Sequence, residues 1–335
     1  MTGEKSEVPS LSSVLHLRRA QAYVDILRVD HWFKNAFMLL GVALAIFWRP
    51  EVLGVGSLLD LLLAVVATCL VASSNYVLNE ILDAPTDRLH PVKRSRPVAR
   101  GDVVGWLGLL QWGIVGLIGI ELAFQVNVPF GGAAFALWAM GCVYNIPPIR
   151  SKEIPYLDVI SESINNPIRL MLGWFALVPD AWPPLSLAIA YWMVGAFFMA
   201  AKRFAELRAF GDEMALEAYR RSFRGYTESR LLASMVFYIV TGALMGGVFV
   251  VRYKLELVLG APVFGGFFAS YMALAMKENS PVQHPEHLHK ESPFFAMALI
   301  TCAVFVLLML LDLPFLYTWF GLERGGPGGL WGLGV

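Results

Sequence analysis

Long apolar segments recur along most of this chain, and they constrain its fold more than any other feature. A transmembrane helix needs about 20 mostly apolar residues, and nine segments approach or exceed that length. With 57% hydrophobic residues, 16% charged residues and no net charge, the composition excludes a soluble domain and a nucleic-acid binder. The sequence therefore predicts an all-α integral membrane protein with nine transmembrane helices, at roughly 34–49, 57–80, 104–125, 130–146, 156–178, 184–201, 231–251, 256–276 and 293–313.

The basic residues are distributed unevenly between the loops of this predicted arrangement. Lys and Arg accumulate in cytoplasmic loops, and with the N-terminus inside, 21 of the 26 Lys and Arg residues fall on the inner side. The pattern predicts a multi-pass protein of the inner (plasma) membrane whose N-terminus faces the cytoplasm. We expect a flexible cytoplasmic leader over 1–24, a transmembrane catalytic domain over 25–313 and a Gly-rich tail over 314–335.

Polar residues form a row at the end of the second apolar segment. Asn79, Asp83 and Asp87 are spaced four residues apart, and Asn75 extends the row by one turn, so all four share one helix face. Such side chains are costly at membrane depth and mark functional sites. Carboxylate and amide oxygens suit Mg²⁺, which also keeps waters and takes substrate phosphate oxygens. The alternative is simple solvation of a helix end near a loop.

A basic loop follows this row directly. It contains five Lys and Arg residues between 88 and 100, among them Lys93, Arg94 and Arg96. Basic side chains beside a metal and carboxylates are what a diphosphate group needs for charge neutralisation. The alternative is the ordinary positive charge of a cytoplasmic loop.

The fifth apolar segment carries a second polar row. Asp158, Glu162, Asn165 or Asn166, and Arg169 fall on one face of a continuous helix. Because a lipid would not tolerate this stripe, we expect it to line the bundle interior or an aqueous cavity. A second carboxylate pair facing the first across a pocket favours a metal-diphosphate cavity. The alternative is a structural salt bridge between Arg169 or another basic residue and one of these acids.

The two acidic rows and the intervening basic loop resemble the UbiA superfamily of intramembrane prenyltransferases. That resemblance implies nine helices around a central cavity and two acidic motifs that hold Mg²⁺ and a diphosphate. In many members Asp stands where this chain has Glu162, and Glu80 follows Asn79 where an Asp is typical of one branch. The branch is that of the polyprenyl-phosphate phosphoribosyltransferases, which the opening Arg28-x₃-Trp32-x-Lys34-Asn35 resembles. The run 201–207 is also similar to that branch.

The resemblance implies transfer of 5-phosphoribose from 5-phosphoribosyl diphosphate to a polyprenyl (decaprenyl) phosphate in the membrane, with release of diphosphate, a step that commonly feeds cell-wall synthesis. The alternative is a UbiA-type prenyltransferase that attaches a polyprenyl chain to an aromatic acceptor. A transporter with a polar midplane helix is a third hypothesis, which the absence of an internal repeat in the sequence disfavours.

The candidate residues fall into three groups. The predicted catalytic residues are Asp83, Asp87, Asp158 and Lys34. The predicted Mg²⁺ ligands are Asn79, Asp83, Asp87, Asp158 and Glu162. The predicted substrate-binding residues are Arg28, Asn35, Asn75, Asn79, Lys93, Arg94, Arg96, Tyr144, Arg169, Lys202 and Arg203.

Overall fold

The computed structural model describes residues 19–88, 93–209, 220–283 and 285–322. Every regular element in these ranges is helical, which confirms the predicted all-α class. The chain divides into two compact units, one of 1–36 and 59–150 and the other of 37–58 and 151–335. Most of the predicted leader and tail lies outside the described residues, so the expected domain limits stay predictions.

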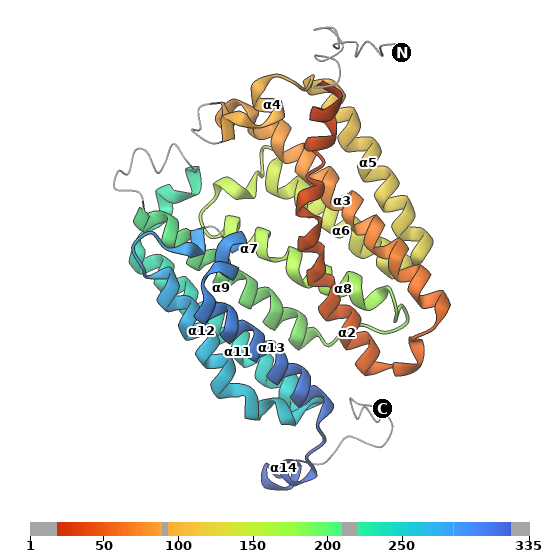
Figure 1. Ribbon diagram of the computed structural model, residues 1–335, viewed down its shortest axis with the longest axis vertical. Coiled ribbons are helices and arrows are strands. Elements are labelled where there is room, and N and C mark those ends of the chain that lie inside the picture. The colour runs from red at the N-terminus through yellow and green to blue at the C-terminus, as the bar shows by residue number, and fades with distance from the viewer. Residues whose placement is uncertain (1–18, 89–92, 210–219, 284, 323–335) are drawn as a thin grey trace, which may run out of the picture. The chain divides into compact units, whose positions relative to one another are not determined.

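The first unit is built from three long helices and several short ones, and Figure 1 labels α3, α4, α5 and α6 among them. The elements are η1 (Val29–Phe37), α3 (Val55–Asp87), η3 (Lys93–Ser95), α4 (Pro97–Arg100), α5 (Gly105–Val126) and α6 (Val128–Asn145). The last residue of η1 and the first four residues of α3 belong to the second unit.

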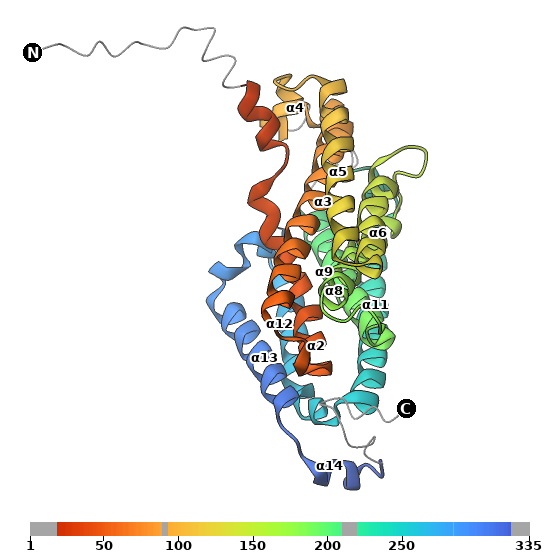
Figure 2. The same ribbon diagram turned by 90° about the vertical axis from the view of Figure 1, so that its right-hand side faces the viewer.

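Small residues allow the three long helices of the first unit to approach closely. A Cβ atom on Gly119 of α5 would lie 3.0 Å from the backbone nitrogen of Val71 in α3. A Cβ atom on Gly141 of α6 would lie 2.2 Å from the side chain of Asn75. Small residues commonly replace larger ones where membrane helices touch, because association there depends on close packing. Figures 1 and 2 show α3, α5 and α6 side by side.

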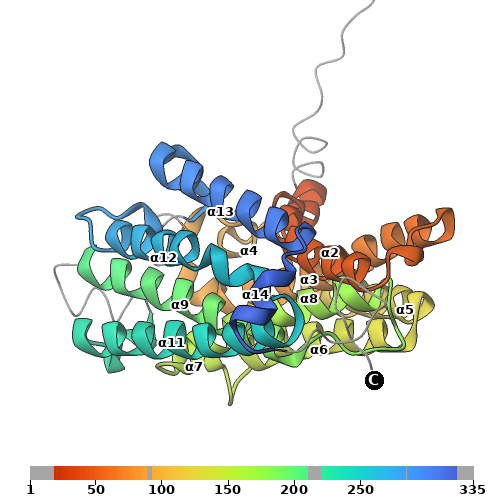
Figure 3. The same cartoon turned by 90° about the horizontal axis from the view of Figure 1, so that it is seen from below.

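The second unit contains the remaining helices. They are α2 (Met38–Trp48), η2 (Pro50–Val52), η4 (Ser151–Glu153), α7 (Leu157–Ser163), α8 (Asn165–Phe175), α9 (Leu185–Ala209), η5 (Arg221–Gly225), α11 (Glu228–Tyr253), η6 (Leu255–Gly260), α12 (Ala261–Ala275), η7 (Pro281–Gln283), η8 (Pro285–Lys290), α13 (Ser292–Leu310) and α14 (Pro314–Trp319). Figure 3 shows α11, α9, α12 and α13 following one another across this unit.

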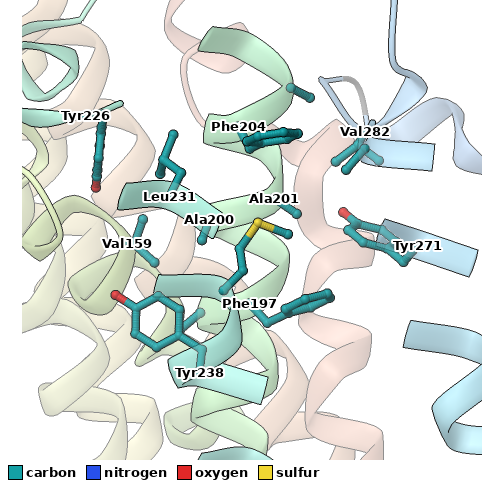
Figure 4. Packing of buried hydrophobic residues seen from close by; sticks show 14 of the residues in the cluster. Val159, Phe197, Ala200, Ala201, Phe204, Tyr226, Leu231, Tyr238, Tyr271 and Val282 are labelled. Atoms are coloured by element: carbon teal, nitrogen blue, oxygen red, sulfur yellow. The ribbon is translucent and has the colours of Figure 1, made fainter. Parts of the chain in front are cut away.

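Helix α9 lies at the centre of the main hydrophobic cluster of the second unit. Phe197 and Phe204 of α9 are buried together with Leu231 of α11 and Tyr271 of α12. Figure 4 shows these side chains arranged around α9. The neighbouring pair α2 and α8 approaches through two glycines, because a Cβ atom on Gly173 would lie 1.9 Å from the carbonyl oxygen of Met38. The cluster and the glycine contact hold the helices that carry the second acidic row.

A buried acid anchors the last helix of the second unit. Glu256 in η6 has no exposed surface and accepts a hydrogen bond from the backbone nitrogen of Leu313, at 3.0 Å, next to the start of α14. Lys254 lies 3.5 Å from the Glu256 carboxylate, so the buried charge has a counter-ion. Lys254 also donates a hydrogen bond to the carbonyl oxygen of Leu311, so these two side chains together connect η6 to the segment after α13.

Seven helices are long and apolar enough to cross a membrane, by length and composition. They are Arg19–Trp48, Gly56–Asp87, Gly105–Val126, Leu185–Ala209, Glu228–Tyr253, Leu255–Ala275 and Ser292–Leu310. They correspond to seven of the nine predicted segments, and many apolar side chains on them are exposed, including Leu117 of α5 and Leu244 of α11. Exposed apolar side chains on such helices suit a lipid environment. The chain is therefore a multi-pass membrane protein.

The count of nine transmembrane helices is not confirmed. The predicted segment 130–146 corresponds to α6, which has 18 residues and falls outside the group of seven because its Gly, Tyr and Asn residues lower its hydropathy. The predicted segment 156–178 is split into α7 and α8 around Ile164. The polar residues of this segment therefore lie on two short helices, whereas the sequence pattern favoured one continuous helix.

Candidate functional site

The first acidic row lies at the end of α3, as its spacing predicts. Pro85 lies inside this helix, which nevertheless continues to Asp87. Proline removes one backbone hydrogen bond but does not have to end a helix when neighbouring contacts support it. Asn79, Asp83 and Asp87 therefore belong to one helical face.

The last residue of α6 and the segment that follows it contact Asn79 and Asp83 of this row. Asn79 Nδ2 donates a hydrogen bond to Asn145 Oδ1 at 2.6 Å, and Asn145 in turn donates to the carbonyl oxygen of Gly141. This arrangement orients the Asn79 amide with its oxygen as the atom available to a cation. Asp83 Oδ1 accepts a hydrogen bond from Arg150 at 2.9 Å, and the two side chains are 21% and 17% exposed.

The basic loop contacts Asp87, the last residue of the same row. Arg96 donates to Asp87 Oδ2 at 2.7 Å, and the Asp87 side chain is only 5% exposed. Glu80, buried on the preceding turn, accepts the backbone N–H of Val98 at 3.2 Å. Arg88 donates to the carbonyl oxygen of Ala99. The loop is thus fastened to the end of α3, and Glu80 acts as a cap for α4.

The N-terminal motif packs against α3 through its Trp and Asn residues. Trp32 Nε1 donates to Ser73 Oγ at 2.8 Å, and Asn35 Nδ2 donates to Cys69 Sγ at 3.2 Å. Asn35 is buried, so its predicted role in substrate binding requires a ligand to reach it from inside the unit. Arg28 lies beside His31 and Asp30. Lys34 is half-buried on η1.

Asp158 in the second unit is enclosed by a polar network. It has no exposed surface, and its Oδ2 accepts hydrogen bonds from Arg203 at 2.9 Å and from Ser222 at 3.1 Å. Its Oδ1 accepts from the hydroxyl of Tyr226. Arg203 also donates to Glu206 at 2.9 Å. The sequence pattern predicts Asp158 as a metal ligand. In the structure its two carboxylate oxygens already accept hydrogen bonds from three protein donors.

Tyr226 connects this network to the start of α7. Its hydroxyl accepts a hydrogen bond from the backbone N–H of Tyr156 at 2.7 Å. The backbone of Tyr156 has a φ of +66°, which residues other than glycine rarely adopt. Burial raises the pKa of Tyr226 above its usual value of 10, and the neighbouring Asp158 charge raises it further. Tyr226 therefore stays a neutral donor that holds Asp158 and the first turn of α7 together.

The remaining polar residues of the second row are separated by the break at Ile164. Glu162 lies at the end of α7, is half-buried, and its carboxylate makes no ion pair or hydrogen bond to any of the described residues. Asn165 and Arg169 lie on α8, where Arg169 donates to the carbonyl oxygen of Asn165. The Asp158 carboxylate is paired with Arg203 of α9 at 2.9 Å and with Arg220 at 3.7 Å, and not with Arg169. Asp158 and Glu162 therefore have different surroundings despite their four-residue spacing.

The other predicted binding residues are distributed over both units. In the first unit, Lys93 and Arg94 lie on η3, Tyr144 lies near the end of α6, and Asn75 donates to the carbonyl oxygen of Leu137. In the second unit, Lys202 is half-buried on α9 next to the fully buried Arg203. The prediction that the two acidic rows face each other across a pocket concerns the placement of the units and stays a prediction.

Several residues whose side chains contact the acidic rows are not among the sequence candidates. They include Asn145 and Arg150 in the first unit, and Arg220, Ser222 and Tyr226 in the second. Glu206 acts on the second row through Arg203. The sequence position of Arg150, in a short loop between two apolar segments, indicates only cytoplasmic loop charge. The signal available for Glu206 was its position on the helical turn after Arg203, and Tyr226 carried no local signal at all.

The donor set of the first row fits a hard divalent cation. No three His, Cys, Asp or Glu side chains in the described ranges form a group that could by itself hold a metal ion. Mg²⁺ needs only one or two carboxylates because it keeps waters and takes phosphate oxygens from a substrate. Asp83 is partly exposed and Asn79 presents an amide oxygen, so this face can supply such ligands. Asp158 fits a cation only if its network opens.

Comparison with known proteins identifies relatives in two ways. The chain is 29% identical over 213 residues to the decaprenyl-phosphate phosphoribosyltransferase of Mycolicibacterium smegmatis, a match covering 62% of this chain and 63% of that protein. It is 28% identical over 210 residues to the protein of the same name from Mycobacterium tuberculosis, covering 62% and 67% of the two chains. The match thus spans less than two thirds of the length of the first relative.

The fold has a counterpart among solved structures. A UbiA homologue from Archaeoglobus fulgidus, solved bound to DMAPP and Mg²⁺, superimposes with a TM-score of 0.64 at 19% identity. The superposition covers 86% of this chain and 99% of the archaeal chain. At this level of identity the likeness concerns the fold. Residues 35–286, which include α3 with its acidic row and the whole Asp158 network, match the model of one family, and the chain belongs to that family, the UbiA prenyltransferases.

Proposed function

We propose that this protein is a Mg²⁺-dependent intramembrane transferase that moves 5-phosphoribose from 5-phosphoribosyl diphosphate to a polyprenyl phosphate and releases diphosphate. The observation that carries the proposal is the row Asn79, Asp83 and Asp87, in which each carboxylate contacts an arginine. Similarity to two mycobacterial decaprenyl-phosphate phosphoribosyltransferases supports this branch of the family. Decaprenyl phosphate is accordingly the acceptor that we test first.

The proposed metal ligands differ in how readily they reach a cation. Asp83 and Asn79 are the accessible ligands of the first unit, and Asp87 joins them when Arg96 moves off it. Glu162 is the proposed ligand of the second unit because its carboxylate has no partner among the described residues. Asp158 stays a predicted ligand that must first exchange its protein donors. Bound Mg²⁺ would neutralise the diphosphate and stabilise the charge that develops on it as it leaves.

Basic side chains of this chain would bind the phosphate groups of both substrates. Arg96, with Lys93 and Arg94 on η3, lies on the loop fastened to the end of α3, and it would donate to the diphosphate of the donor. Lys34 and Arg28 on the N-terminal segment would hold a second phosphate. Such donors stabilise charge developing on a leaving group, which is mainly electrostatic catalysis. Lys202 is a further proposed contact to the ribose 5-phosphate.

The chemistry asks little of a general base. A lipid phosphate is already anionic at neutral pH, so its oxygen can attack the C1 atom of the ribose without first losing a proton. Departure of diphosphate and attack at C1 require the two substrates to be held in line, which is a matter of positioning. This agrees with the absence of a histidine from the two acidic rows of the sequence.

A second candidate function is transfer of a prenyl group from a prenyl diphosphate to an aromatic acceptor. The archaeal homologue of similar fold was solved with the prenyl diphosphate DMAPP, and the same acidic rows would serve that reaction. The two functions differ in the substrate that carries the diphosphate.

The deciding experiment supplies membranes containing the protein with labelled 5-phosphoribosyl diphosphate, decaprenyl phosphate and Mg²⁺. We expect a labelled lipid that does not form in EDTA or with Asp83→Asn. A second arm offers a labelled prenyl diphosphate with a hydroxybenzoate. Prenylation of the ring without a labelled phosphoribosyl lipid would replace the proposed function with the second candidate.

We further propose that the catalytic domain spans 25–313 and that the basic ends of its helices face the cytoplasm. The asymmetry of 21 among 26 Lys and Arg residues supports this orientation. A cysteine introduced at Arg94, which is exposed on η3, should react with a membrane-impermeant maleimide only after the cells are opened. Labelling in intact cells would show that these helix ends face outward, which is the opposite of the proposed orientation.

A further inference from the structure

Arg150 contacts the acidic row in a way that its sequence position did not suggest. Its guanidinium donates to Asp83 Oδ1 at 2.9 Å, and both side chains keep some exposure, 17% for Arg150 and 21% for Asp83. The backbone of Arg150 has a φ of +33°, a region that costs side-chain-bearing residues free energy. Such strain persists only where the surrounding structure holds it, and it often marks a functional position.

Arg96 makes the corresponding contact at the next turn of α3. It donates to Asp87 Oδ2 at 2.7 Å, with the Asp87 side chain 5% exposed and Arg96 26% exposed. Arg96 thus covers the carboxylate, and a cation could reach Asp87 only after this arginine has moved. Arg96 and Arg150 come from different segments, yet each occupies one carboxylate of the same helical face.

An arginine and a divalent cation compete for the same carboxylate. Displacing the guanidinium leaves a positive charge next to an incoming cation, and this is unfavourable unless the guanidinium finds another anion. A diphosphate supplies that anion, and arginine binds phosphate oxygens with paired, charge-assisted hydrogen bonds. The exchange therefore becomes favourable when the cation and a diphosphate arrive together.

We propose that Arg96 and Arg150 are exchangeable counter-ions of the acidic row, an inference that rests on the proposed function. Each arginine releases its carboxylate and donates the same N–H groups to a diphosphate oxygen, while the carboxylate turns to the cation. Charge balances without any proton transfer. The arrangement makes cation and diphosphate bind cooperatively, so the cation alone binds weakly and the pair binds tightly.

The test measures Mn²⁺ binding to the full-length protein in detergent micelles by electron paramagnetic resonance. Titrations are made with Mn²⁺ alone and with Mn²⁺ plus inorganic diphosphate. Arg150→Met should bind Mn²⁺ alone about tenfold more tightly than the wild type, because a competing cation has been removed, and bind diphosphate in the presence of Mn²⁺ about tenfold more weakly. A purely structural role of Arg150 would not tighten Mn²⁺ binding.

Arg100→Met is the matched control. Arg100 also pairs with an aspartate in the same unit, Asp102, at 2.7 Å, but away from the acidic row, so its replacement should change neither titration. Arg150→Lys keeps the charge and should retain the weak binding of Mn²⁺ alone. If Arg150→Met fails to accumulate as folded protein, Arg96→Met tests the same exchange at Asp87.

The outcomes separate this inference from the proposed function. Loss of Mn²⁺ binding in Asp83→Asn, together with unchanged or weaker binding of Mn²⁺ alone in the arginine-to-methionine variants, overturns the exchange but keeps the metal site. Unchanged Mn²⁺ binding in Asp83→Asn overturns the metal site and therefore the proposed function. Tighter binding of Mn²⁺ alone in Arg150→Met with weaker diphosphate binding supports the exchange.

Discussion

Asp83 and Asp158 are both aspartates paired with an arginine, but their surroundings are opposite. The Asp83 and Arg150 side chains are partly exposed and joined by one hydrogen bond of 2.9 Å. The Asp158 and Arg203 side chains are 0% and 2% exposed, and Asp158 also accepts from Ser222 and Tyr226. The first pair can exchange partners at small cost, while the second would leave a buried charge without compensation.

The difference shows that an acidic residue in a membrane protein has two distinct uses. A carboxylate with an accessible oxygen can bind a cation or a substrate, and one whose oxygens are all occupied by buried donors holds helices together. Asp158 joins α7 to α9 and to the segment around η5 through its three donors. Sequence spacing alone does not distinguish the two uses. Four predictions test the comparison, in order of decreasing effect.

Replacing Asp83 should have the largest effect, and it should fall on turnover. We expect Asp83→Asn to lower the rate at least a thousandfold, about 4 kcal/mol in activation free energy, while the thermal unfolding temperature changes little. The reason is loss of a proposed metal ligand at a partly exposed position. Turnover by the purified variant is compared with its unfolding curve. A near-normal rate would remove Asp83 from the metal site.

Replacing Asp158 should act mainly on stability. Asp158→Asn removes a carboxylate that pairs with the buried Arg203 and also lies 3.7 Å from Arg220. We expect a loss of about 3 kcal/mol in the free energy of unfolding, measured by denaturant unfolding in mixed micelles. Asp180→Asn is the matched control, because Asp180 pairs with Arg49 at 2.7 Å on the surface of the same unit, where an ion pair contributes about 0–1 kcal/mol. Full stability with lost turnover would instead assign Asp158 to the metal.

Tyr226→Phe removes one donor from Asp158 and the acceptor of the Tyr156 N–H. We expect a loss of about 1.5 kcal/mol in the free energy of unfolding, since a buried carboxylate oxygen loses a hydrogen bond. Combining Tyr226→Phe with Asp158→Asn should cost less than the sum of the two single changes. Strict additivity in the double-mutant cycle would show that the two residues do not act as one network.

The raised pKa of Tyr226 predicts a loss of stability at high pH. A tyrosine whose folded-state pKa exceeds its unfolded value of about 10 contributes stability that is present below pH 10 and declines as the pH rises above it. At pH 10.5 we expect a loss of about 0.8 kcal/mol relative to pH 8. The wild type and Tyr226→Phe are compared over this range. An equal decline in both proteins would assign the effect to other groups.

The sequence predicted the helical class, the acidic row of α3 and its basic loop, because these depend on local patterns. Hydrophobic length sets the helices, and four-residue spacing sets one face of a helix. The interruption at Ile164 was missed because Asp158, Glu162 and Arg169 have the spacing of a continuous helix. The sequence also does not reveal the role of Glu80, because its partner is the backbone N–H of Val98, 18 residues away in the chain.

The sequence by itself determined the membrane character of this protein and the residues from which its charged sites are built. Only the tertiary structure decided which partner each charge has, namely Arg150 for Asp83, Arg96 for Asp87 and Arg203 for Asp158. The physical reason is that the behaviour of a carboxylate depends on its burial and on the donors around it. Those donors come from segments up to 68 residues away in the chain, as Tyr226 does for Asp158.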